Sequence, residues 1–216
     1  MKSVLVIGMG RMGRHLAHKL SLLGNDVMIA DKDPVLIESL ADRFTDSSIC
    51  DCTNEAVIRS LGVDNFDICF VTIGEDFQSS LVVTSLLKKY GARRIIAKTN
   101  QDIQSDLLRI IGADEVVYPE VEVAEKLAVR CNSDHIFDYI PMPGQYAIYE
   151  ISILPQWVGK TVVEVDVRRR YQINIMAVKH GEETNINVGP DYCFREDDHI
   201  VVIGRSDEVF RLVAKK

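Results

Sequence analysis

The feature that most constrains this chain is the stretch Val4–Arg14, which reads VLVIGMGRMGR. A short apolar run ends in a glycine motif of the form G-x-G-x-x-G at residues 8–13, and apolar residues at helical spacing follow it. In such units the first glycine permits a tight turn, the second lets a phosphate approach the backbone, and the third lets the helix pack near the strand. The stretch therefore predicts an anion site at the helix N-terminus, and the alternative is a glycine-rich turn without a ligand.

Strand-like and helix-like segments alternate from Val4 to Tyr118. The expected strands after Val4–Ile7 are Asp26–Ala30, Ser47–Cys50, Ile68–Ile73, Arg94–Ala97 and Glu115–Tyr118. The expected helices are Arg14–Leu23, Pro34–Phe44, Asn54–Leu61 with Thr53 as N-cap, Gln78–Tyr90 and Asp102–Ile111. This alternation predicts an α/β fold, a Rossmann-like doubly wound parallel sheet with helices on both faces.

Asp31 follows the second expected strand and is the candidate partner of a ribose. Asp33-Pro34 reads as the N-cap and first residue of the next helix, which leaves Asp31 available for another role. In nucleotide-binding sheets a carboxylate at this place accepts hydrogen bonds from ribose hydroxyls. The alternative is a solvated aspartate in a turn.

Ligands of doubly wound sheets bind beyond the carboxyl ends of the strands. The residues that the sequence places there are the candidate nucleotide contacts: Gly8, Met9, Gly10, Arg11, Met12, Gly13, Asp31, Lys32, Asp51, Cys52, Thr53, Ile73, Gly74, Glu75 and Lys98.

Two charged residues suggest a ligand with several phosphates. The Arg11 guanidinium lies within the glycine motif and could form paired hydrogen bonds with phosphate oxygens; the alternative is an arginine that faces solvent. Glu120 follows the last expected strand, and a carboxylate near a polyphosphate is repulsive unless a cation bridges the two. Glu120 is therefore a candidate metal ligand, with charge matching at a helix N-terminus as the alternative.

The pattern changes after about residue 133. We expect a nucleotide-binding domain with a trailing helix over residues 1–133, a linker at 134–144 that contains Pro141 and Pro143, and a small α+β domain at 145–216. Expected elements of the last domain are strands at Tyr146–Leu154, Asn174–Lys179, Glu183–Val188 and His199–Ile203, and helices at Thr161–Val167 and Asp207–Val213. A unit this small has a thin core, so we expect it to pack against a second copy for ligand sensing and dimerisation.

Composition narrows the class of protein. The 216 residues carry a net charge of −7, which argues against a nucleic-acid-binding surface. We expect no membrane span, because apolar runs stay below the roughly 18–20 residues that a span needs. We expect no signal peptide, because the first apolar run is too short and contains the glycine motif. The chain has five cysteines, and this odd number indicates that the thiols are reduced and that most of them are packing residues. Cys50 and Cys52 match neither a C-x-x-C redox motif nor a usual zinc half-site, and metal or redox use is the minority alternative.

Catalytic signatures are missing from the sequence. It contains no Tyr-x-x-x-Lys, no G-x-S-x-G and no His–Asp pair in a plausible substrate domain. A nucleotide site without catalytic groups points to sensing, in which a ligand shifts a conformational equilibrium through its different affinities for two states. We therefore expect a sensor and not an enzyme.

Several motifs resemble those of the TrkA/KtrA family, the cytosolic gating subunits of bacterial potassium uptake systems that are built from RCK domains. The resemblance lies in V-I-G-M-G-R-M-G at Val6–Gly13, Asp31, D-C-T at Asp51–Thr53, I-G-A-D-E-V-V-Y-P-E at Ile111–Glu120, and the segments Ala177–Gly181 and Val201–Gly204. One copy of each domain is similar to the single-unit KtrA type. Cys50 departs from the pattern, since many relatives have glycine before D-x-T, and this puts Asp51 in doubt as a direct contact.

The resemblance implies a cytoplasmic subunit that is peripheral to the inner face of the membrane through a Trk- or Ktr-type potassium transporter. It implies dimers formed through the crossover helix, an octameric ring, and binding of an adenine nucleotide (ATP/ADP or NAD/NADH) in the first domain. Arg11 would contact the terminal phosphates, Asp31 the ribose, and Glu120 a divalent cation or Na⁺ between ligands. Some family members bind cyclic di-AMP in the second domain. Alternatives are an RCK subunit of another ion exchanger or channel, or a small NAD-dependent oxidoreductase.

Overall fold

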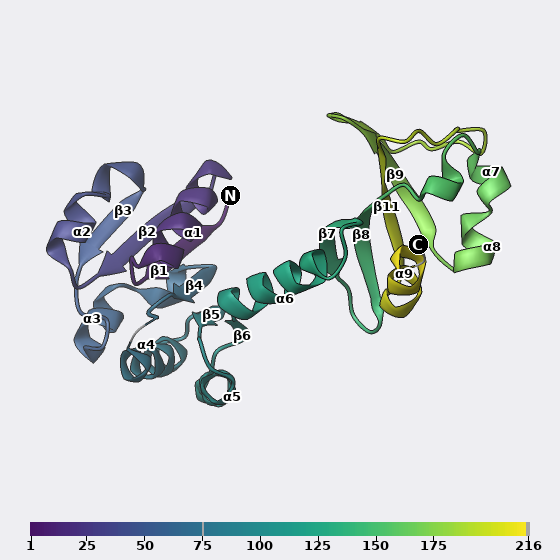
Figure 1. The fold of residues 1–216 in the computed structure, drawn as a ribbon. Helices are drawn as coiled ribbons and strands as arrows, with labels where there is room; N and C mark the ends of the chain where they lie inside the picture. The colour runs from purple at the N-terminus through teal and green to yellow at the C-terminus, as the bar shows by residue number, and fades with distance from the viewer. Residues whose placement is uncertain (75, 215–216) are drawn as a thin grey trace. The chain divides into compact units, whose positions relative to one another are not determined.

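The computed structural model describes residues 1–74 and 76–214, and the chain divides into two compact units, Met1–Glu120 and Val121–Lys216 (Figure 1). No helix in the described part of the chain is both long and apolar enough to cross a membrane.

The first unit is a six-stranded parallel sheet in the order β3-β2-β1-β4-β5-β6, which confirms the predicted Rossmann-like doubly wound fold. The strands are β1 (Ser3–Ile7), β2 (Asp26–Asp31), β3 (Asp46–Ile49), β4 (Ile68–Val71), β5 (Ile95–Lys98) and β6 (Glu115–Val117). The helices are α1 (Arg11–Leu22), α2 (Pro34–Glu38), α3 (Glu55–Ser60), α4 (Phe77–Lys89) and α5 (Asp102–Ile111), with short 3-10 helices at Ala41–Arg43 and Val63–Asn65.

Alternate residues of β1 enter two separate cores, one on each face of the sheet. Val4 and Val6 pack with residues of α1 and α2, whereas Leu5 and Ile7 pack with residues of α3, α4 and α5. All four are nearly inaccessible to solvent, as expected of a strand buried on both faces of a parallel sheet. The strand order reverses between β1 and β4, so the glycine motif after β1 lies at the switch point of the sheet.

Two helix starts differ from the sequence expectation. Helix α1 begins at Arg11 and not at Arg14, because Gly10 takes an extended conformation and acts as the N-cap, so Arg11 and Gly13 lie in its first turn. The N-cap of α3 is Asn54 and not Thr53, since the Asn54 side chain accepts a hydrogen bond from the N–H of Ala56 at 2.9 Å.

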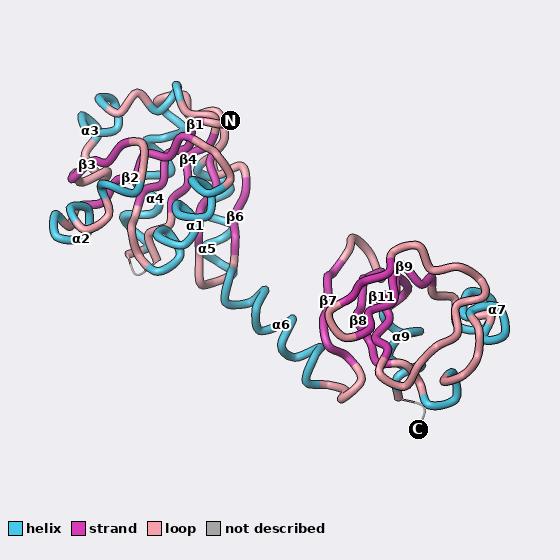
Figure 2. The backbone as a smooth tube through the Cα atoms, turned by 90° about the horizontal axis from the view of Figure 1, so that it is seen from above, coloured by secondary structure: helices cyan, strands magenta, loops and turns pink. Residues whose placement is uncertain are grey.

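The second unit begins within helix α6 (Pro119–Cys131) and contains an antiparallel sheet in the order β10-β9-β11-β8-β7. Its strands are β7 (Ile136–Pro141), β8 (Tyr146–Ser152), β9 (Asn174–His180), β10 (Glu183–Asn185) and β11 (Asp198–Arg205). Its other helices are α7 (Val162–Val165), α8 (Val167–Tyr171) and α9 (Ser206–Val213), with a 3-10 helix at Pro155–Trp157. Figure 2 shows the strands side by side with α9 next to them.

The expected linker at 134–144 is mostly strand β7 in the structure. Ile136 is buried in the core of the second unit, and β7 pairs with β8 along its length. The proline- and glycine-rich residues that suggested a linker form the hairpin turn between the two strands, where Gly144 has φ +81° and the N–H of Met142 bonds to the carbonyl of Tyr146.

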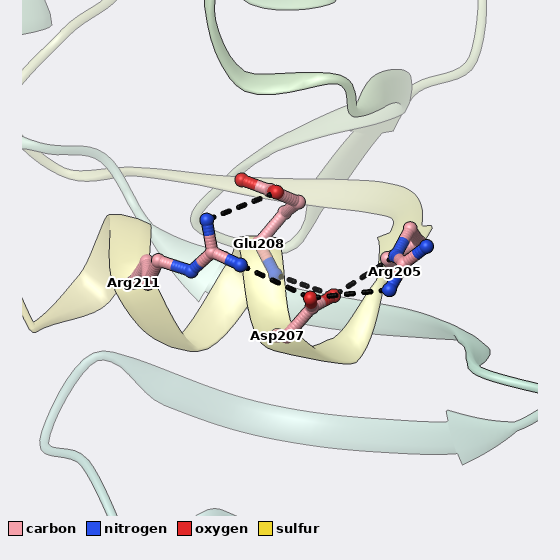
Figure 3. A network of polar contacts seen from close by, with 4 residues as sticks. All are labelled: Arg205, Asp207, Glu208 and Arg211. Carbon is pink, nitrogen blue, oxygen red and sulfur yellow. Dashed lines mark hydrogen bonds and ion pairs between the residues drawn. The ribbon is translucent and has the colours of Figure 1, made fainter.

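The single helix expected at Thr161–Val167 is two helices. Thr161 and Glu164 form a capping box at the start of α7, with each side chain bonded to the other's backbone. Asp166 then takes a left-handed conformation with φ +47°, which ends α7, and α8 follows. At the other end of the unit, Asp207 pairs with Arg205 and Arg211 where α9 begins (Figure 3). These pairs are exposed, so they contribute little to stability.

Candidate functional site

A cavity of about 320 Å³ opens at the carboxyl ends of the central strands of the first unit. Its lining residues come from the ends of β1, β2, β3 and β4 and from the start of α4: Ile7, Gly8, Gly10, Asp31, Lys32, Cys50, Asp51, Cys52, Thr53, Thr72, Ile73, Gly74, Asp76, Ser79 and Val83. This is the edge where doubly wound sheets bind their ligands, and the volume is at the lower end of ordinary small-molecule sites.

The three glycines of the motif meet different surroundings. Gly8 has φ +96°, a conformation that side chains disfavour, and it makes the turn out of β1. A Cβ on Gly13 would lie 2.0 Å from the carbonyl oxygen of Gly8 and 2.6 Å from the Thr72 hydroxyl, so α1 packs against the turn only because Gly13 has no side chain. Gly10 has nothing within 4 Å of its Cβ position and lines the cavity, which leaves space for a ligand at the N-terminus of α1.

Asp31 ties the glycine turn to the end of β2. Its Oδ2 accepts a hydrogen bond from the N–H of Met9 at 2.6 Å, and its Oδ1 accepts one from the N–H of Asp33 at 3.0 Å. Each carboxylate oxygen can accept a further hydrogen bond, and Asp31 is partly exposed in the cavity wall. Asp33 caps α2 through the N–H groups of Val35 and Leu36, which agrees with the sequence expectation.

Thr72, the residue directly after β4, holds the same turn. Its hydroxyl lies 3.0 Å from the carbonyl oxygen of Ile7 and 2.5 Å from that of Gly8. Sequence reasoning missed this residue. The available signal was a hydroxyl at the end of an otherwise apolar strand beside the switch point.

Two further carboxylates of the cavity lining are held by local hydrogen bonds. Asp51 accepts bonds from the Thr53 hydroxyl at 2.7 Å and the Thr53 N–H at 3.0 Å, which lower the pKa of Asp51. Asp76 caps α4 and accepts bonds from the hydroxyl and N–H of Ser79, which lower the pKa of Asp76. With Asp31 these groups outnumber Lys32, the cation among the described lining residues. These carboxylates repel anions and can accept hydrogen bonds from hydroxyl groups.

The structure brings nine of the predicted contacts together in the cavity wall: Gly8, Gly10, Asp31, Lys32, Asp51, Cys52, Thr53, Ile73 and Gly74. Glu75 lies outside the described residues. Met9, Arg11, Met12, Gly13 and Lys98 do not line the cavity. The Met9 side chain is fully buried in a core with Ile37, so a contact of Met9 with a ligand would have to come from its backbone at the turn. The lining residues not predicted as contacts are Ile7, Cys50, Thr72, Asp76, Ser79 and Val83.

Arg11 is the first residue of α1, beside Gly10. It is exposed and makes no ion pair with any described residue. Its guanidinium is therefore available to an anion bound at the helix N-terminus.

Glu120 pairs with Lys98 at 2.8 Å, and this hydrogen bond lowers the pKa of Glu120. The Lys98 side chain is largely buried, and a Cβ on Gly74 would lie 3.5 Å from its ammonium nitrogen, so the pair lies near the edge of the candidate site. Within residues 1–74 and 76–214, histidine, cysteine and carboxylate side chains form no group of three or more that could hold a metal ion. A cation at Glu120 would need further ligands, such as phosphate oxygens.

Two protein-family models match the chain, the TrkA-N domain over residues 4–119 and the TrkA-C domain over residues 147–215. The chain is 33% identical over 210 residues to the Ktr system potassium uptake protein C of Bacillus subtilis (strain 168), an alignment that covers 97% of this chain and 95% of the relative. It is 29% identical over 210 residues to the Ktr system potassium uptake protein A of the same organism, and this alignment also covers 97% of this chain and 95% of the relative.

Among solved structures, the fold resembles the GsuK channel with a TM-score of 0.71 at 19% identity, covering 98% of this chain and 38% of that one. It resembles the GsuK channel bound to NAD with a TM-score of 0.71 at 16% identity, covering 100% of this chain and 40% of that one. The chain thus spans about two fifths of the length of these channels. At these identities the likeness establishes a shared fold.

Proposed function

The chain belongs to the TrkA/KtrA family, and on that premise we propose that it is a nucleotide-sensing regulatory subunit that gates a membrane potassium transporter. The observation that carries the proposal is the open backbone at Gly10, at the N-terminus of α1, in a chain 33% identical to a potassium uptake protein.

The proposed ligand is an adenine nucleotide, ATP/ADP or NAD/NADH. Its phosphates would lie against Gly10 and the first N–H groups of α1, and its ribose hydroxyls would donate to Asp31. Because carboxylates outnumber cations among the described lining residues, the phosphate charge needs a cation from elsewhere. Arg11 is the proposed source, and a divalent cation or Na⁺ near Glu120 is a second proposed source.

The proposed mechanism involves no covalent chemistry, so we place the chain outside the enzymes. Two nucleotides can switch the partner only if each binds two conformations of the subunit with different affinities. An oxidoreductase would instead need a proton donor and a place for a second substrate beside the nucleotide.

The proposed partner is a Trk- or Ktr-type transporter subunit, which would hold this chain at the cytoplasmic face of the membrane. Apolar side chains on α6 support self-association, since Val121, Val123 and Leu127 are between 42% and 56% exposed in the single chain. We further propose that the chain forms dimers and that these assemble into an octameric ring. We also propose that the second unit binds cyclic di-AMP.

Binding and transport test the proposal separately. We expect calorimetry to detect binding of ATP and of NAD to the full-length chain. In cells that contain the cognate transporter, we expect potassium uptake to fall when this chain is deleted. Lack of binding by any adenine nucleotide would contradict the sensing role. Steady turnover of a nicotinamide substrate would contradict the non-enzymatic role.

A further inference from the structure

Two thiols meet in the wall of the cavity. Cys50 follows β3 and Cys52 lies two residues further on, and their Sγ atoms are 3.8 Å apart. Both residues line the cavity, Cys50 partly exposed and Cys52 buried. The remaining thiols are placed differently, because Cys69 is buried in the core while Cys131 and Cys193 are exposed in the second unit.

The two thiols differ in chemical character. A hydrogen bond from the Cys52 thiol lowers the pKa of Cys50, although burial and the nearby carboxylates Asp51 and Asp31 oppose this change. The same hydrogen bond, together with burial, raises the pKa of Cys52. Because Cys50 is partly exposed in the cavity wall and Cys52 is buried behind a sulfur contact, a peroxide can reach Cys50 first, and Cys52 is placed as the resolving thiol.

We infer that Cys50 and Cys52 form a reversible, redox-sensitive dithiol that tunes the nucleotide affinity of the adjoining cavity. The contact between the sulfurs and their shared place in the cavity wall carry this inference. The effect on affinity rests on the proposed function, whereas the thiol chemistry stands apart from it.

The oxidant is a hydroperoxide, and the reaction balances in two steps. The Cys50 thiolate attacks one peroxide oxygen, an S–O bond forms, the O–O bond breaks, and the leaving oxygen takes up a proton as water when the oxidant is hydrogen peroxide. The Cys52 sulfur then attacks the sulfur of the Cys50 sulfenic acid, the S–S bond forms, and the S–O bond breaks. The departing hydroxide takes the Cys52 proton as water. Peroxide gains two electrons, the thiols lose two, and a dithiol reductant reverses the change by exchange.

The disulfide would act on the nucleotide site through Asp51, the residue between the two cysteines. A disulfide requires its sulfurs at about 2.05 Å, so they must approach from their present contact and the backbone between them must adjust. That backbone presents Asp51 and Thr53, which are hydrogen-bonded to each other and line the cavity. Oxidation therefore alters the cavity wall, and we expect weaker nucleotide binding.

The thiol chemistry is tested on the full-length chain carrying Cys131→Ser and Cys193→Ser, which removes the exposed thiols. After limited hydrogen peroxide, differential alkylation and mass spectrometry should find that the tryptic peptide 44–59, which contains both cysteines, has lost two hydrogen atoms. A dithiol reductant should reverse this change, and Cys50→Ser and Cys52→Ala should each abolish it. If both thiols of the parent peptide remain alkylatable, or oxidise only irreversibly, the inference is wrong.

The effect on affinity is measured as the ratio of ATP Kd between the oxidised and reduced forms of the same protein. We expect a ratio of about fivefold or more in the parent and no change on peroxide treatment of Cys50→Ser. By reciprocity, saturating ATP should slow oxidation of the pair. A disulfide that leaves the Kd unchanged overturns the tuning role. If the reduced protein binds no nucleotide, the proposed function fails instead, and the peptide measurement still decides the chemistry of the pair.

Discussion

At the scale of single residues, the glycine motif separates into positions that build the fold and a position that faces a ligand. Gly13 is enclosed by the carbonyl of Gly8 and the hydroxyl of Thr72, whereas Gly10 borders open space. Both are glycines of one motif, yet a methyl group has opposite consequences at the two sites. This contrast makes them a matched pair for experiment.

We expect Gly13→Ala to reduce the free energy of unfolding by about 1–3 kcal/mol or more, because its Cβ has no room. Gly10→Ala should change stability by no more than about 1 kcal/mol, since the backbone there has φ −64° and the site is a helix N-cap. The second variant should instead weaken ATP binding about tenfold or more, as the methyl group occupies the phosphate's approach. Urea unfolding and calorimetry measure the two effects, and equal ATP affinity of Gly10→Ala and the parent would remove Gly10 from the site.

Arg11 is predicted to discriminate between ligands by charge. Arg11→Ala should weaken ATP more than NAD, because a guanidinium beside the N-terminus of α1 gains most from a terminal triphosphate. Arg14→Ala is the matched control, an exposed arginine on the same helix. The test compares the Kd values of ATP and NAD, measured by calorimetry, between each variant and the parent. If Arg11→Ala loses the same factor in affinity for both ligands, Arg11 does not contact the additional phosphate charge.

The candidate site was predictable from sequence where local spacing defines it. Gly8, Gly10 and Asp31 lie at strand ends whose positions the apolar runs already reveal. Thr72 and Ser79 were missed because only the pairing of β4 with β1 and the start of α4 bring them to the cavity. Spacing also could not show that the side chain of Met9 turns into the core while its backbone stays at the turn.

At the scale of elements, parallel strands were easier to predict than the boundaries of the second unit. The buried apolar runs of the first unit identify its strands, since both faces are covered. Strand β7 was mistaken for a linker because much of it is exposed and it ends at a proline. The left-handed Asp166 between α7 and α8 was unpredictable, because no glycine marks it.

Glu150 of β8 links three strands of the second sheet and should make that unit sensitive to acid. Its carboxylate is 2.6 Å from the Lys179 ammonium of β9 and 3.1 Å from His199 of β11. Burial raises the pKa of Glu150, but these two hydrogen bonds outweigh it, so the folded-state value lies below the ordinary one near 4.5. A carboxyl group whose pKa is lowered by folding stabilises the fold at pH values above its unfolded-state pKa. This contribution disappears as the pH falls through its folded-state pKa.

Glu150→Gln should therefore lower the urea midpoint at pH 7, and the difference from the parent should be smaller at pH 3, because the stabilisation by a carboxylate with a lowered pKa is lost as the pH falls. Glu164→Gln would disturb the capping box of α7, so Glu183→Gln on the exposed strand β10 is the better control. If the urea midpoint of Glu150→Gln lies below that of the parent by the same amount at both pH values, then packing, and not charge, explains the effect.

At the scale of the whole molecule, the two units are of different kinds: one contains a six-stranded parallel sheet and the other a five-stranded antiparallel sheet. Membership of the TrkA/KtrA family was predictable because its motifs run through both units, from the glycine turn to the last strand. An assembly of several copies would bury surfaces that are exposed in a single chain. Helix α6 offers such a surface, since none of its residues is buried in the single chain.

The apolar positions of α6 recur at helical spacing, as Ala124, Leu127, Ala128 and Cys131, and all are exposed. Burying such a stripe against a second copy is favourable by about 25 cal/mol per Å² of apolar surface removed from water. Leu127→Glu should therefore shift sedimentation velocity profiles from oligomers towards monomers. Lys126→Glu introduces the same side chain at the preceding position, which lies outside the stripe, and should preserve the oligomer. If the parent chain is already monomeric at the concentrations tested, α6 does not join copies of this chain.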